Sequence, residues 1–379
     1  MQHPSQMLTL TLTALLLAAS CHGQVAGDPR NDGTGAVAGA GNGNATGGGS
    51  SGGGTGSGTL GLGPTGMHRL SRIEYDNTLR DLLGDSTRPG FARLPEDVHD
   101  PFDNDYKTQL VSGALIAAAE TLATEAAARV IADPVRRDAM VGCKPSGPDD
   151  HACMDAFVRR FGRRAFRRPL TADEITAYTA LQSYAIESKD FYAGVELAVR
   201  AMLQDPSFLY RVEVGQPVAG STDLFRLDDF EIGTRLSYFL WGTMPSDEML
   251  DLAAAGGLAS AGGRRAAAQK LLADPQGAER VRAFHAFWLG YHQLPVAATL
   301  GDALRAETNA LVTRVVVERK EDYFQLFRSP QTFLTDALAM HYGLAAPGST
   351  SGTWVTYSGT ARRGILSHGA VLAAGAKFD

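Results

Sequence analysis

The chain has 379 residues, a formal net charge of −6, three cysteines and 44% hydrophobic residues. A negative overall charge provides no field to hold a polyanion, so nucleic acid is disfavoured as a partner. Three cysteines are too few for a disulfide-stapled scaffold or a zinc cluster.

The first residues predict an export signal. The uncharged apolar run over residues 8–19 is too short to span a bilayer and has the length of a signal-peptide core. The small residues before Cys21 resemble the lipobox of bacterial lipoproteins, in which the cysteine is lipidated and becomes the mature N-terminus. We therefore expect a signal peptide over residues 1–20 and a lipid anchor on Cys21. Ordinary secretion and a buried structural segment are the alternatives.

A Gly/Ser-rich tract with no aromatic residue follows over residues 21–66. Such a segment cannot bury enough apolar surface to offset its ordering entropy, so we expect a disordered tether. Its root-mean-square span as a Gly-rich coil is about 35 Å, which lifts a domain off a membrane surface.

The rest of the chain predicts a mainly α fold of multi-helical, bundle-like domains. Ser71 with Glu74, and Thr171 with Glu174, form capping boxes that predict helix starts, and Gly84 predicts a stop. Strand-like alternation occurs only near residues 353–357. Apolar periodicity predicts further helices over residues 106–132, 152–168, 191–210, 227–241, 246–255, 264–273, 278–289 and 303–327. We expect domains over residues 67–142, 143–215, 216–346 and 347–379.

Cys143 and Cys153 flank a Pro- and Gly-containing loop, and in an oxidising compartment we expect them to form a disulfide. The chain-entropy estimate for a loop of this size is about 2.5 to 3 kcal/mol of stabilisation. A metal site that adds His151 is the alternative, but it lacks a fourth ligand.

Six arginines lie within ten residues opposite the apolar Phe157, Phe161 and Ala165. Arginine forks suit carboxylates and phosphates, so this face is a candidate anion-binding site; a solvated or salt-bridged helix face is the competing interpretation. The six are Arg159, Arg160, Arg163, Arg164, Arg167 and Arg168.

Residues 96–105 contain five carboxylates and an asparagine, which makes Asp100, Asp103 and Asp105 weak calcium candidates. The glycine and downstream glutamate of an EF-hand are missing, so we expect no metal, and Asp103 or Asp105 capping a helix near Tyr106 is the alternative.

The histidines and serines give weaker signals. His285, His292 and His341 lack a carboxylate at ligand spacing, so aromatic packing is favoured over metal binding. Ser237 and the pair Ser367 and His368 lack a Gly-x-Ser-x-Gly elbow, which disfavours a serine hydrolase.

Five segments in order resemble the planctomycete-type exported multidomain family, which is built from planctomycete-specific domains of unknown function and is also common in myxobacteria. They are RLSRIEYDNTLRDLLG (69–84), FGRRAFRRPLT (161–171), DPSFLYRVE (205–213), RLSYFLWGTMPSDE (235–248) and RGIL (363–366). Relatives usually continue into a cytochrome-c-like module with a Cys-x-x-Cys-His haem motif. The resemblance implies that haem c belongs to that module, and residues 347–379 are expected to begin a truncated cytochrome-associated segment.

The resemblance and the predicted anchor together imply an exported scaffold without catalytic residues or a cofactor of its own, anchored by lipid at the outer membrane or cell surface beside a redox partner. The alternative is an extracellular protein that binds or degrades polysaccharide, with the arginine face and paired acids as its site and an acidic polysaccharide as its partner. Carbohydrate sites generally need exposed aromatic rings and paired carboxylates. Trp241 and Trp288 lie in apolar helical patterns, so we expect both in the core.

Overall fold

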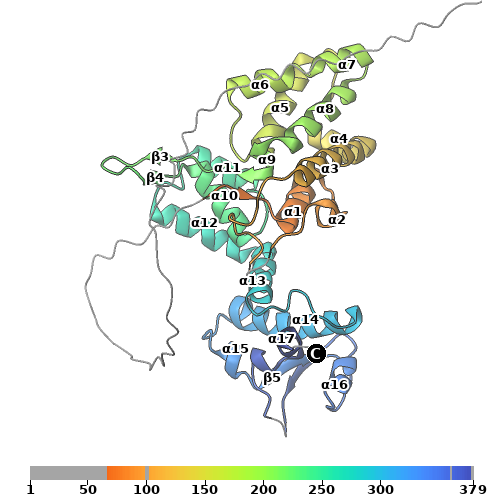
Figure 1. Ribbon diagram of the computed structural model, residues 1–379, viewed down its shortest axis with the longest axis vertical. Coiled ribbons are helices and arrows are strands. Elements are labelled where there is room, and N and C mark those ends of the chain that lie inside the picture. The colour runs from red at the N-terminus through yellow and green to blue at the C-terminus, as the bar shows by residue number, and fades with distance from the viewer. Residues whose placement is uncertain (1–65, 99–101, 359–360, 377–379) are drawn as a thin grey trace, which may run out of the picture. The chain divides into compact units, whose positions relative to one another are not determined.

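The computed structural model describes residues 66–98, 102–358 and 361–376, all within one compact unit, Gly63–Asp379 (Figure 1). Helices dominate this part of the chain, which confirms the mainly α fold class. The predicted signal peptide, Cys21, the tether up to residue 65, and Asp100 lie outside the described residues. Within the described ranges, every helix is too short or too polar to cross a bilayer.

The elements of the first part follow in chain order. They are β1 (His68–Arg69), α1 (Arg72–Leu83), α2 (Pro89–Arg93), α3 (Gly113–Ala132), α4 (Pro134–Val141), α5 (His151–Ala165), α6 (Ala172–Thr179), α7 (Gln182–Ser188), α8 (Phe191–Gln204), α9 (Pro206–Leu209), β2 (Tyr210–Arg211), β3 (Gln216–Pro217) and β4 (Phe225–Arg226).

The second part continues with helices and one longer hairpin. Its elements are α10 (Asp229–Leu240), α11 (Asp247–Ala254), α12 (Ala261–Ala273), α13 (Pro275–Trp288), α14 (Ala298–Val312), the π-helix η1 (Thr313–Glu318), α15 (Gln325–Arg328), β5 (Gln331–Leu334), α16 (Asp336–His341), β6 (Thr353–Thr356), the 3₁₀-helix η2 (Ile365–Ser367) and α17 (Gly369–Gly375).

Local capping chemistry fixes several helix starts. Ser71 and Thr171 each accept a hydrogen bond from the backbone of the glutamate three residues on, and that glutamate accepts from the cap backbone, as the sequence predicts. Gly84 ends α1 in the left-handed region at φ 70°. Asp228 forms a third capping box at the start of α10.

Several predicted helices have different bounds. The helix predicted over 191–210 ends at Gln204, and α9 and β2 follow it. The helix predicted over 106–132 begins at Gly113, because Ser112 accepts from the Leu115 backbone and caps it. The helix predicted over 152–168 ends at Ala165, and Arg167 adopts a left-handed φ of 62° beyond it. The segment predicted as one helix over 303–327 changes at Thr313 from α14 to the π-helix η1.

The described residues contain three antiparallel strand pairs, of which β1 with β2 joins the most distant parts of the chain. β6 confirms the strand predicted near 353–357 and pairs with β5, with Phe333 opposite Trp354. β1 pairs with β2, which places His68 opposite Arg211. β3 and β4 form a small hairpin.

The largest apolar core crosses the boundary predicted between residues 67–142 and 143–215. Leu79, Leu122, Phe157 and Val195, from α1, α3, α5 and α8, are all fully buried in it. A further cluster joins α14, β5, α16 and α17. Helix α13 contacts α10 and α12 and also α14 and η1, so it adjoins both groups of helices.

Candidate functional site

The six arginines predicted as an anion-binding face lie on α5 and directly after it, and they bind different groups of the chain. Arg159, Arg160, Arg163 and Arg164 lie on α5, opposite the buried Phe157 and Phe161. Arg167 and Arg168 follow the helix, because α5 ends at Ala165.

The α5 arginines bind groups of the chain itself. Arg163 donates to the Asp251 carboxylate at 2.6 Å, and Arg164 donates to the Asp81 carbonyl at 2.8 Å. Arg159 pairs with Asp155, one turn away on the same helix, at 2.7 Å. Arg160 donates to the Met140 carbonyl in α4. Three of the four guanidiniums therefore cross-link α5 to another element.

The two arginines after α5 are also engaged. Arg168 donates two hydrogen bonds to the Glu174 carboxylate, of 2.9 and 2.8 Å. Arg167 is 3% exposed and donates to the carbonyls of Ser207, Phe208 and Tyr210. Burial lowers the pKa of Arg167, but a guanidinium stays charged at neutral pH. These contacts correspond to the salt-bridged interpretation of the arginine run.

Asp97 and Asp105 of the acidic segment 96–105 accept hydrogen bonds from neighbouring parts of the chain. Asp97 pairs with Arg69 at 2.8 Å and accepts the Arg72 backbone N–H at 2.7 Å. Asp103 is buried, and burial together with the nearby Glu74 raises its pKa. Asp105 accepts the Lys107 backbone N–H in a turn, so neither Asp103 nor Asp105 caps a helix at Tyr106.

The described residues contain no group of three or more His, Cys, Asp or Glu side chains placed to hold a metal ion. Cys143 and Cys153 form the predicted disulfide, with Cα atoms 5.8 Å apart. His151, the alternative third ligand, contacts Gln182 Oε1 at 2.6 Å.

The three histidines discussed as ligands lie in separate environments. His285 is buried in α13, donates from Nδ1 to the Val281 carbonyl at 2.7 Å and accepts from the Tyr323 hydroxyl at 2.9 Å. Burial lowers its pKa, so it is neutral at pH 7. His292 lies beyond the end of α13 at Trp288 and packs against Phe287, and His341 is exposed in α16.

A cavity of about 340 Å³ lies between α10, α12, α13 and the loop at Phe102. Its lining is mainly apolar and includes Leu240, Leu272, Phe284 and Phe287, while Asp103 and Arg280 bring charge to it. This combination of an apolar wall with a few polar groups is typical of small-molecule sites.

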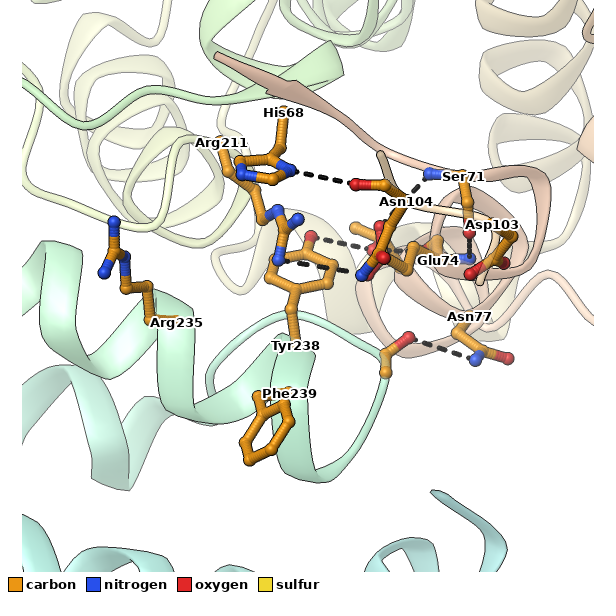
Figure 2. A network of polar contacts seen from close by, with 12 residues as sticks. His68, Ser71, Glu74, Asn77, Asp103, Asn104, Arg211, Arg235, Tyr238 and Phe239 are labelled. Carbon is orange, nitrogen blue, oxygen red and sulfur yellow. Dashed lines mark hydrogen bonds and ion pairs between the residues drawn. The ribbon is translucent and has the colours of Figure 1, made fainter. Parts of the chain in front are cut away.

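A second, more open cavity of about 490 Å³ adjoins the first, since Asn104 and Phe239 line both. It is lined by charged and aromatic side chains from β1, β2 and α10, among them His68, Arg211 and Arg235. In Figure 2, His68 and Arg211 lie close to Asn104 and Glu74, and Arg235 lies apart from them on α10. We call the two cavities together the aromatic cleft.

Exposed aromatic rings continue from the cleft along α13. Phe284 stacks between Phe102 and Trp288, with ring centroids 5.5 and 6.2 Å apart. Phe239, Phe284 and Trp288 are 68%, 45% and 42% exposed. The prediction that Trp288 lies in the core is therefore wrong, because the helix turns this edge of its apolar stripe outward. Trp241 is partly buried and donates from its indole to the Leu271 carbonyl at 2.8 Å.

A buried polar network in the second core was not predicted. Glu307 is 1% exposed, and its carboxylate accepts from the hydroxyls of Thr332, Tyr342 and Tyr357. His368 Nε2 lies 3.9 Å from Glu307.

Of the serines considered as nucleophiles, one binds a backbone carbonyl and the other is buried in a helix. Ser367 donates to the Gly364 carbonyl, and the Ser237 hydroxyl is buried in α10.

The fold and the cleft define a mainly helical, disulfide-containing protein with a cleft lined by aromatic side chains. Three domain families match the chain: PSD3, Protein of unknown function (DUF1587), over residues 68–132; PSD5, Protein of unknown function (DUF1595), over 153–213; and PSD4, Protein of unknown function (DUF1592), over 227–344. The chain belongs to the planctomycete-type multidomain family that carries these domains. No curated protein and no solved structure matches it significantly.

Proposed function

We propose that the chain is an exported, lipid-anchored helical scaffold of a cell-surface protein that works beside a cytochrome module. The observation that carries the proposal is the cross-linking of α5. Arg160, Arg163 and Arg164 tie this helix to α4, α11 and the end of α1, which suits a rigid spacer. The Cys143–Cys153 disulfide supports export, because disulfides persist in oxidising compartments.

The anchor is tested by Cys21→Ser in the full chain, followed by fractionation of the native cells. We expect the wild type in the membrane fraction and the variant in the soluble exported fraction. Cys143→Ser is the matched control, since it removes a cysteine without touching the predicted anchor. A Cys21→Ser protein that stays in the membrane fraction would contradict lipid anchoring.

The redox partner is tested by chemical cross-linking in native membranes. A scaffold beside a cytochrome module gives a cross-linked species that contains both this chain and covalent haem. The measurement is a haem stain of the denatured band purified through this chain. Haem-free cross-linked bands under conditions that capture other partners would contradict the cytochrome association.

A second candidate function is binding of polysaccharide, and the exposed rings of Phe239, Phe284 and Trp288 favour it. Aromatic side chains bring large contact area at low entropy cost, and rings in a row along α13 present that area to an extended ligand.

Affinity electrophoresis of the full chain through gels that contain soluble polysaccharides tests this function. We expect Trp288→Ala to weaken retardation about tenfold or more, as for an aromatic anchor in an interface. Phe225→Ala is the control, because Phe225 is 55% exposed on β4 and lines neither cavity of the cleft. Equal retardation of both variants and the wild type would refute a role for this surface.

A further inference from the structure

Arg211 is a buried cation with an unsatisfied hydrogen-bond donor. The residue is 8% exposed, and its Nε has no hydrogen-bond partner. Its guanidinium lies against the Tyr238 ring, 5.5 Å from the ring centroid, and 3.9 Å from Glu74 Oε1, which is also without a hydrogen bond (Figure 2). A buried charged group that is left unbonded is costly, so this arrangement calls for an acceptor.

The acceptor can arrive through the cleft, because Arg211 lines its open cavity of about 490 Å³. Arg235 lines the same cavity but is already held by Glu213, with bonds of 2.7 and 2.5 Å. His68 donates from Nδ1 to the Asn104 carbonyl, and burial and the adjacent Arg211 lower its pKa. His68 is therefore neutral at pH 7. Arg211 is the arginine of this cavity that has no hydrogen bond to its neighbouring carboxylate, because Glu74 Oε1 lies 3.9 Å away, so it is the cation that a ligand can bind.

The walls beside Arg211 define the rest of the ligand. Tyr106 and Phe239 line the same cavity, and Phe239 leads into the apolar cavity and the row of rings at Phe284 and Trp288. A guanidinium fork matches the two oxygens of a carboxylate, and aromatic walls match the apolar faces of sugar rings.

We infer that Arg211 binds the carboxylate of a uronic acid residue in an acidic polysaccharide whose neighbouring sugars lie along Phe239, Phe284 and Trp288. The inference rests on the proposed polysaccharide binding and names the class of polymer. It also moves the anion-binding role from the arginines of α5, which bind groups of the chain itself, to an arginine of β2.

The experiment compares the full chain on polygalacturonate and on the neutral polymer dextran at the same ionic strength, by isothermal titration calorimetry. We expect the wild type to bind polygalacturonate about tenfold or more tightly than dextran, because one hydrogen bond to a charged group changes a dissociation constant by about this factor. Arg211→Lys keeps the charge but removes the fork, and should lose most of this preference. Arg159→Gln is the matched control, since it removes an exposed arginine of α5.

Phe239→Ala is the second cleft variant, and it is expected to fold because Phe239 is 68% exposed. It should weaken binding of both polymers, while Phe225→Ala should weaken neither. Thermal unfolding of each variant identifies any that fails to fold. If Arg211→Lys fails to fold, the test rests on the preference of the wild type for polygalacturonate over dextran and on the binding of Phe239→Ala.

The outcomes separate the inference from the proposed function. Equal wild-type affinity for both polymers, or an unchanged preference in Arg211→Lys, overturns the uronate inference and leaves polysaccharide binding in place. Loss of the preference in Arg159→Gln with retention in Arg211→Lys also overturns it, in favour of α5. Absence of binding to either polymer refutes the polysaccharide function and the inference together.

Discussion

Replacing Glu307 by glutamine tests the buried network of the second core. The carboxylate accepts three hydroxyl bonds, from Thr332, Tyr342 and Tyr357. Glutamine presents a single acceptor oxygen and no charge, so at least one hydroxyl loses its acceptor and the remaining bonds weaken. With about 1 kcal/mol for each weakened bond and 1 to 3 kcal/mol for a stranded buried group, we expect a loss of about 3 kcal/mol.

The assay is urea unfolding followed by the fluorescence of Trp354, which lies on β6 opposite Phe333. Trp241→Phe and Trp288→Phe in the background leave Trp354 as the single tryptophan, since the chain has three. For a unit of this size the urea m-value is about 3 kcal/mol/M or more, so a loss of about 3 kcal/mol lowers the urea midpoint by up to about 1 M. Glu318→Gln is the matched control, because Glu318 is exposed at the end of η1.

An unchanged or higher midpoint for Glu307→Gln would refute this reasoning. It would mean that the desolvation free energy of the buried carboxylate exceeds the stabilisation from its hydroxyl hydrogen bonds, which is known for some buried ionic groups.

Three other predictions concern the disulfide, a buried histidine and haem. Replacing both Cys143 and Cys153 by serine should lower the free energy of unfolding by about 2.5 to 3 kcal/mol, and full alkylation of both thiols in unreduced native protein would contradict the bridge. Burial lowers the pKa of His368, so as the pH drops the unfolded chain takes up this proton before the folded chain does, and the free energy of unfolding should fall below about pH 6.5. Urea midpoints from pH 8 to 5 should depend less on pH in His368→Gln than in the wild type, while His341→Gln, at an exposed position, serves as the control. The chain should retain no haem after denaturation when produced in a host competent for cytochrome c maturation. Attachment needs two cysteines three positions apart followed by a histidine, whereas Cys143 and Cys153 are ten positions apart and Met154 follows Cys153. A covalently held Soret absorbance would contradict this.

The features predicted correctly from the sequence depend on residues close together in the chain. The capping boxes at Ser71 and Thr171 and the stop at Gly84 involve contacts over three or four residues, which a linear pattern contains. The disulfide closes over ten residues, and the loop composition shows that its ends can meet. The helix start at Ser112 was missed because apolar periodicity continues into the turn before it, and the local cap decides the boundary.

The site depended on contacts that no local pattern encodes. Arg211 reaches the cavity beside Asn104 only because β1 and β2 pair across the first core. Glu307 meets Tyr357 across 50 positions, and nothing near Glu307 marks it as buried. The arginine run was visible in the sequence, but its partners Asp81 and Asp251 lie 83 and 88 positions away, so the choice between free and paired guanidiniums could not be made from spacing.

The pairing of β1 with β2 has a consequence for biosynthesis. His68 lies opposite Arg211, so the first strand of the folded part has no partner until α1 to α9 have been made. The disulfide, by contrast, can close as soon as Cys153 is available, because its loop is short and the entropy cost of closure is small. Disulfide formation can thus precede the pairing of β1 with β2. A chain interrupted before residue 210 would carry the disulfide while lacking Arg211 and the cavity wall that it forms.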